Sequence, residues 1–210
     1  MSQTNPPSQE WRARLLAAAL DEAPDAGWTQ ISLQRAAATA GLDKGQAEWA
    51  APRGAADLLD LFEDMADQAM LDNAGLGSNS LRGRVRTLIM ARFAYMQRHR
   101  EALRRAASPS LAAEAPRRLW RTADRIWRRL NDPSTDGNFY SKRTILTGVL
   151  GASMLVFLND DTADLTETEA FVARRLDDVM AFEKAKAAVG KALAPAEGLL
   201  DALAKLRYGR

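Results

Sequence analysis

Apolar residues recur every three or four positions along nearly all of this 210-residue chain, and no stretch of useful length alternates as a strand would. Proline and glycine interrupt the pattern at Pro24 and Gly27, at Gly41, and again at Pro52 and Gly54. With 47% apolar and 27% charged residues, the composition is typical of a folded globular protein. The sequence therefore predicts an all-α fold with short turns between its helices.

The N-terminal part of the chain has the pattern of a helix-turn-helix. Ala37 and Gly41 lie four positions apart, where a small residue lets two helices cross closely and glycine takes the turn conformation. Ser32 and Asp43 are placed to cap the two short helices. We expect the core of this unit to contain Ile31, Leu33, Leu42 and Trp49.

Longer helices follow, and the Gly-, Ser- and Asn-rich residues 73–80 mark a joint before them. The uncharged stretch 144–159 is shorter than the about 20 residues of a membrane span, so we interpret it as a buried core helix. Helices are predicted over residues 10–22, 32–40, 44–50, 55–71, 81–98, 101–111, 115–131, 140–159, 167–189 and 195–207. We divide the chain into a disordered N-terminus (1–9), the helix-turn-helix unit (10–54), a larger helical ligand-binding domain (55–189) and a C-terminal amphipathic helix (190–210).

Few side chains in this sequence suit catalysis or metal binding. The chain has no cysteine, which excludes disulfides, thiolate metal sites and a cysteine nucleophile. Its one histidine, His99, lies in a basic run that we expect to be exposed at a helix end, and a di-iron carboxylate bundle needs two histidines. We predict no catalytic residue, no metal site and no enzyme activity.

The charges point to no polyanionic partner. The net charge is only +2, although residues 82–129 are rich in arginine. A guanidinium suits phosphate or carboxylate, but we interpret these arginines as solvated faces of amphipathic helices. In the second helix of the helix-turn-helix only Lys44 and Gln46 are plausible DNA contacts, since Ala47 and Ala50 offer no hydrogen bonds and Glu48 would repel phosphate.

Residues 14–62 resemble the N-terminal domain of TetR-type regulators. Lys44 and Gly45 match the lysine-glycine start of that family's reading helix. The family's tyrosine and histidine phosphate contacts do not match, because Glu48, Trp49 and Ala50 stand there. A TetR-type repressor that releases DNA when it binds a ligand is therefore the alternative function.

Residues 119–161 and 171–187 resemble the ubiquinone (coenzyme Q) biosynthesis family that shares the TetR fold and binds lipid. The resemblance covers residues 11–188 and is most specific over 119–143. Two positions depart from the family pattern: Gly137 replaces an aromatic residue, and Phe139 stands where tryptophan is usual. These changes bear on partner docking more than on the fold.

The resemblance implies a TetR-like fold and a non-enzymatic accessory protein that binds an isoprenoid lipid or quinone and no other cofactor. It further implies a homodimer and a partner of the demethoxyubiquinone hydroxylase type. The N-terminal residues look like neither a signal nor a transit peptide. We therefore expect a cytoplasmic protein, held peripherally at the inner face of a bacterial membrane, and we expect no DNA partner.

Three sets of residues follow as candidate sites. The lipid-binding set is Leu88, Ile89, Met90, Phe93, Met96, Trp120, Ile126, Trp127, Tyr140, Leu146, Val149, Leu150, Met154 and Phe157. The partner-docking set is Ser134, Thr135, Asp136, Asn138, Phe139, Tyr140, Lys142 and Arg143. The membrane-binding set is Leu199, Leu200, Leu203, Lys205, Leu206 and Arg207.

Each set also has a purely structural interpretation. The apolar side chains can form a filled core rather than a tunnel. Ser134 and Asp136 can serve only as helix caps. The C-terminal helix can pack on a partner helix or in a dimer as well as on a membrane.

Overall fold

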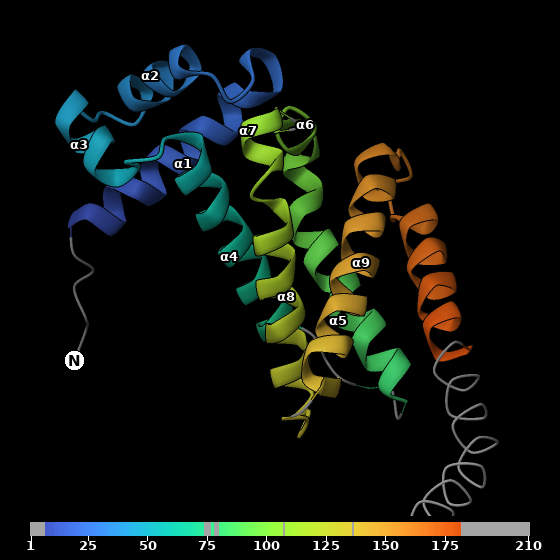
Figure 1. Cartoon of the computed structure of the whole chain (residues 1–210). Helices are drawn as coiled ribbons and strands as arrows, with labels where there is room; N and C mark the ends of the chain where they lie inside the picture. Colours follow the sequence, from blue (N-terminus) through green and yellow to red (C-terminus); the bar gives the residue numbers. More distant parts are fainter. Residues whose placement is uncertain (1–6, 74–76, 78–79, 107, 136, 182–210) are drawn as a thin grey trace, which may run out of the picture. The chain divides into compact units, whose positions relative to one another are not determined.

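The computed structural model describes residues 7–73, 77, 80–106, 108–135 and 137–181, and their regular structure is entirely helical (Figure 1). The all-α prediction is therefore confirmed. The chain divides into two compact units, Met1–Val172 and Ala173–Arg210, and the contacts described below are those of the first unit. The four-part division of the sequence stays a prediction. The helices are α1 (Pro7–Ala26), α2 (Gln30–Thr39), α3 (Lys44–Ala50), α4 (Ala55–Asn73), α5 (Leu81–Met96), a 3-10 turn (Gln97–His99), α6 (Arg100–Arg104), α7 (Pro109–Ala112), α8 (Ala115–Arg129) and α9 (Gly137–Asn159), followed by helix 166–181.

Reciprocal side-chain caps start both short helices of the helix-turn-helix. Thr29 Oγ1 accepts the Ser32 N–H at 3.1 Å while Ser32 Oγ accepts the Thr29 N–H at 2.9 Å. Asp43 and Gln46 exchange the same pair of bonds at 2.8 and 3.0 Å. The predicted Asp43 cap is confirmed, whereas the first cap is Thr29 and not Ser32, so α2 begins two residues earlier than predicted. Gly41 makes the turn with φ +64°, as its spacing indicated.

The core of the helix-turn-helix is built from smaller side chains than the sequence suggested. Leu42 is buried, but Ile31 is 63% exposed and Trp49 is 71% exposed, so their assignment to the core is wrong. The inward residues are the direct neighbours, Ser32 on α2 and Ala50 on α3. Successive residues of a helix point about 100° apart, so Ile31 and Trp49 turn outward.

Helix α9 buries one stripe and exposes the other side. Its buried residues are Arg143, Leu146, Val149, Leu150, Ser153 and Phe157. Leu155, on the opposite side, is 67% exposed. Among the described residues, only this helix is long and apolar enough to cross a membrane by length and composition, and 33% of its most apolar window is buried. The interpretation of residues 144–159 as a buried core helix therefore holds for one face of α9 only, because the opposite face is exposed.

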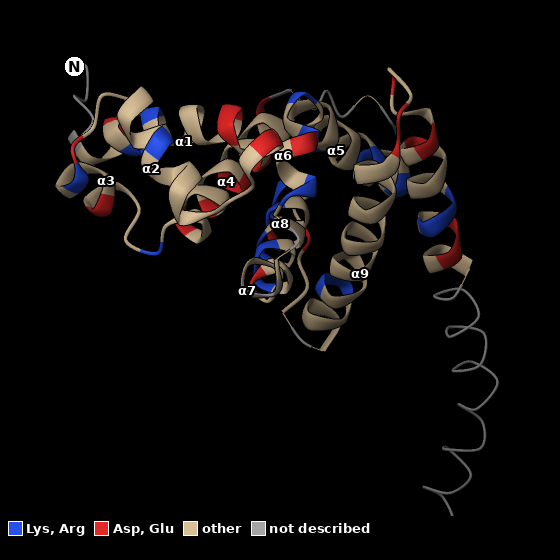
Figure 2. Cartoon of the chain, turned by 90° about the horizontal axis from the view of Figure 1, so that it is seen from above, with Lys and Arg blue, Asp and Glu red and all other residues tan. Residues whose placement is uncertain are grey.

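Four arginines of α8 pair with carboxylates on α4, namely Arg117, Arg118, Arg121 and Arg125. Figure 2 shows the basic residues along α8 and the acidic residues of α4. Arg118 Nε lies 2.7 Å from Asp60 Oδ1, and Arg125 Nη1 lies 2.9 Å from Asp67 Oδ2. Asp60 and Asp67 are seven residues apart, so they share one face of α4. We call this set of contacts the polar seam; it fixes α4 against α8.

The polar seam continues into α5 through a fully buried arginine. Arg92 is 0% exposed, and its Nε donates to Asp67 Oδ1 at 2.8 Å while Nη2 donates to Glu63. Burial raises the pKa of Asp67 to about 6, although Thr122 and Arg125 act against the rise. Burial also lowers the pKa of Arg92 to about 9, helped by the nearby cations Arg121 and Arg125. The interpretation as solvated faces is therefore wrong for Arg92 and Arg118, because a buried guanidinium requires such partners. It holds for exposed arginines such as Arg98, Arg117, Arg128 and Arg129.

Candidate functional site

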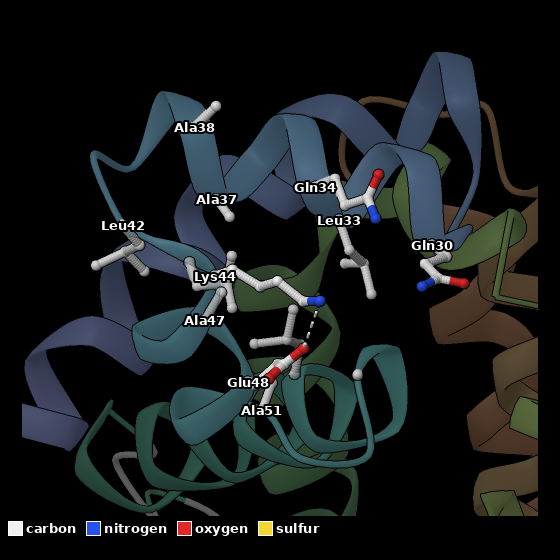
Figure 3. A pocket seen from close by; sticks show the side chains of 13 residues that line it. Gln30, Leu33, Gln34, Ala37, Ala38, Leu42, Lys44, Ala47, Glu48 and Ala51 are labelled. Carbon is white, nitrogen blue, oxygen red and sulfur yellow. Dashed lines mark ion pairs between the residues drawn. The ribbon is translucent and has the colours of Figure 1, made fainter.

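The helix-turn-helix carries a groove with an apolar floor rather than a basic surface. The groove, of about 480 Å³, runs between α2 and α3 (Figure 3). Ala37, Leu42 and Ala47 line it, and at its edge Lys44 Nζ lies 3.8 Å from Glu48 Oε1. This ion pair places the Glu48 carboxylate beside Lys44, the basic side chain best placed to contact DNA.

Other cations of the helix-turn-helix are engaged within the protein. Arg12 Nε donates to the Ala50 carbonyl at 2.6 Å, and Arg14 donates to the Ala40 carbonyl. Arg53 Nη2 lies 2.7 Å from Asp60 Oδ2. Residues 10–54 contain five basic and six acidic side chains, so this unit has little to attract phosphate.

The predicted lipid-binding set separates into an inner and an outer group. The inner group lies on α5, α8 and α9, and the rings of Phe93 on α5 and Phe157 on α9 stack with centroids 4.8 Å apart. We call this inner group the apolar seam; its members, all buried, are Leu88, Ile89, Phe93, Met96, Ile126, Leu146, Val149, Leu150 and Phe157. The structure thus buries nine of the fourteen predicted residues.

The outer group lies on the α8–α9 surface instead. Tyr140 is 64% exposed, and its ring centroid lies 6.5 Å from that of Trp120. Trp127 Nε1 donates to the Lys142 carbonyl at 3.3 Å. Met90, Trp120, Trp127 and Met154 are half-buried. A lipid-binding role for either group stays a prediction, and only the inner group has the burial that an isoprenoid tail would need.

The partner-docking set contains residues that hold the structure together, namely Ser134, Lys142 and Arg143, and neutral residues that face solvent. Lys142 Nζ donates to Asp132 Oδ1 at 2.6 Å and to Ser134 Oγ at 2.7 Å. Arg143 is 2% exposed and donates to Asp124 Oδ1 at 2.7 Å.

Around these buried contacts lies a neutral surface. The guanidinium of Arg143 lies 3.4 Å from the centroid of the half-buried Phe139 ring. Thr135, Asn138 and Tyr140 are exposed, and Asp136 lies outside the described residues. A docking surface here would therefore be aromatic and neutral.

Two polar groups beside the apolar seam were not predicted from the sequence. Arg92 Nη1 donates to the thioether of Met96 at 3.2 Å, and Ser153 lies fully buried in the inward stripe of α9. The recurrence of Asp60, Asp64 and Asp67 on one face of α4 could have indicated buried arginine partners. Nothing in the sequence distinguishes Ser153 from an ordinary helical serine.

His99 has a packing role. It is half-buried rather than exposed as predicted, and its ring meets Phe62 edge-on with centroids 5.6 Å apart. Burial lowers its pKa, and Arg98 adds to the effect. Within the described residues, no group of three or more His, Asp or Glu side chains is placed to hold a metal ion. The membrane-binding set, residues 199–207, lies outside the described residues.

Comparisons with known proteins agree with this architecture. A family model described as COQ9 matches residues 112–183. The mitochondrial ubiquinone biosynthesis protein COQ9 of Rattus norvegicus is 27% identical over 210 residues, which cover 92% of this chain and 67% of the rat protein. The Homo sapiens protein of the same name is 25% identical over 215 residues, covering 95% of this chain and 67% of its own length.

The solved structures add a match at the level of the fold. The crystal structure of a TetR transcriptional regulator from Nitrosomonas europaea superposes with a TM-score of 0.63 at 18% identity, covering 80% of this chain and 97% of the regulator. At that identity the match concerns the fold alone. Both resemblances inferred from the sequence are therefore confirmed: the chain is similar to the COQ9 ubiquinone biosynthesis proteins, and its fold is similar to that of a TetR regulator.

Proposed function

We propose that this chain is a non-enzymatic accessory protein that holds an isoprenoid quinone precursor in the apolar seam. The observation that carries the proposal is the apolar seam itself, a set of nine buried side chains on α5, α8 and α9 that includes the stacked Phe93–Phe157 pair. An isoprenoid tail needs such depth and few polar partners. Met96 suits a site that must adapt, because its unbranched side chain can change rotamer as a ligand enters.

The same proposal gives the α8–α9 surface the role of presenting the ligand to a hydroxylase. Exposed Tyr140 and half-buried Phe139, whose ring centroids lie 5.1 Å apart, form an aromatic feature of the kind common at protein interfaces.

We further propose that the chain forms a homodimer. Residues 195–207 would hold it at the inner face of the bacterial membrane, where the leucines would insert and Lys205 and Arg207 would face headgroups.

Regulation of transcription is the second candidate function, favoured by the TetR-like fold. The engaged arginines and the Lys44–Glu48 pair argue against it. A tight binder makes roughly six to ten phosphate contacts, and this helix-turn-helix has five basic residues in total.

Native mass spectrometry of the purified full chain tests the proposal. We expect a co-purifying lipid, or uptake of a ubiquinone with a two-isoprene tail. Leu150→Ala changes a buried residue of the apolar seam and should alter uptake, whereas Leu155→Ala changes the exposed side of α9 and should not. A chain that never carries lipid and takes up no quinone would contradict lipid binding. Tight, sequence-selective DNA binding at low salt would favour the repressor.

A further inference from the structure

Ser153 is the one uncharged polar residue in the buried stripe of α9. It lies between Leu150 and Phe157 in that stripe, three residues after the first and four before the second, so the three share one helix face. Phe157 stacks on Phe93 of α5, which places Ser153 one turn from the centre of the apolar seam. All four residues are at most 1% exposed.

The Ser153 hydroxyl has no hydrogen-bond partner among the described residues. The three other buried hydroxyls of this part of the chain do have partners. Ser32 Oγ donates to the Gly27 carbonyl at 2.5 Å, Thr122 Oγ1 to Asp67 Oδ1 at 2.9 Å, and Thr168 Oγ1 to Asp160 Oδ2 at 2.6 Å. A buried hydroxyl without a partner destabilises the fold, so each such case in a native protein calls for an explanation.

The backbone of α9 does not supply an acceptor for the Ser153 hydroxyl either. A serine or threonine inside a helix can donate to the carbonyl four residues earlier. Thr87 and Thr147 do so at 3.0 and 2.7 Å, and so does Ser141 of α9 itself at 3.0 Å. Ser153 makes no such bond, although it lies in the stripe of α9 that carries the residues of the apolar seam.

We infer that the Ser153 hydroxyl donates a hydrogen bond to an acceptor oxygen of the ligand held in the apolar seam. The inference rests on the proposed function and makes it more specific: the ligand is apolar but carries a carbonyl-type oxygen, as a quinone does. In a site without competing water, a hydrogen bond of this kind discriminates between an oxygenated ring and a plain hydrocarbon.

Two ligands and two serine variants test the inference in the full chain. The probes are ubiquinone with a two-isoprene tail and the same tail on an unsubstituted benzene ring, with affinities measured by native mass spectrometry. Ser153→Ala should weaken quinone binding by about threefold to tenfold and leave hydrocarbon binding unchanged. Ser141→Ala, on the same helix but exposed, should change neither affinity.

Thermal unfolding without ligand supplies a second measurement. The Ser153 hydroxyl makes no hydrogen bond to the described residues, so its removal breaks none. Ser153→Ala should therefore melt no lower than the wild type. Thr122→Val removes a hydroxyl that has partners and should melt lower. A Ser153→Ala chain that melts lower while its quinone affinity is unchanged would mean that the hydroxyl is satisfied by a buried water, and this would overturn the inference.

The two possible failures are distinguishable. If the wild type binds both probes and Ser153→Ala weakens them equally or not at all, the inference fails while lipid binding stands. If the wild type binds neither probe, the proposed function fails and the inference fails with it.

Discussion

The polar seam and the apolar seam hold neighbouring helices together by opposite means. In the polar seam, guanidinium groups meet carboxylates at distances near 2.8 Å across α4, α5 and α8. In the apolar seam, α5, α8 and α9 meet through aliphatic side chains and one stacked aromatic pair. Ion pairs have only a few good geometries, whereas aliphatic contacts tolerate repacking. The comparison suggests a fixed half of the bundle beside a half that can adapt to a ligand.

Removing one partner of the polar seam should have the largest effect. Asp67→Ala leaves Arg92 buried without its main carboxylate, and we expect the free energy of unfolding in urea to fall by about 4 kcal/mol. The double variant Arg92→Met with Asp67→Leu removes both charges and should be more stable than Asp67→Ala. A loss below about 1 kcal/mol would show that the polar seam does not hold α4 in place.

Shortening one side chain of the apolar seam should lower the free energy of unfolding somewhat less. Leu150 is 1% exposed, and Leu150→Ala should lower the free energy of unfolding by about 3 kcal/mol through lost burial and a residual cavity. Leu155→Ala on the exposed side should change stability by less than about 0.5 kcal/mol. Equal losses at the two positions would contradict the one-sided packing of α9.

The smallest of the three expected losses of stability is that of a substitution at Asp160, the residue that follows α9. Its carboxylate accepts the Thr168 N–H at 2.8 Å and the Thr168 hydroxyl at 2.6 Å, and Thr162 donates to it as well. Burial alone would raise the pKa of Asp160, but the hydrogen bonds from Thr162 and Thr168 outweigh burial and hold the pKa at about 2. The pKa is thus depressed in the folded state.

A depressed carboxylate pKa stabilises the fold above about pH 4 and loses that contribution as the pH falls toward 2. Asp160→Asn should therefore lower the free energy of unfolding by about 2 kcal/mol at pH 7 and by much less at pH 2.5. Asp161→Asn, at an exposed neighbour, is the control. Chemical denaturation at the two pH values measures the difference, and a loss independent of pH would mean that the charge of Asp160 is not the cause.

Much of the fold could be predicted because helices are local. Spacing, proline and glycine located the helices, and the Asp43 cap and the Gly41 turn were found from neighbouring residues alone. The weak DNA-binding chemistry of α3 was also evident from its own composition. The burial of nine residues of the candidate lipid site could be predicted because they lie on the apolar faces of their helices.

The sequence by itself determined where helices begin, which faces are apolar and which family the chain resembles. Only the tertiary structure decided that Ile31 and Trp49 face outward, that Arg92 is buried, and that Ser153 has no hydrogen-bond partner among the described residues. The physical reason is distance along the chain. Arg92 and Asp67 are 25 residues apart, and Arg118 and Asp60 are 58 apart, so their contacts depend on how whole helices pack and not on any local pattern.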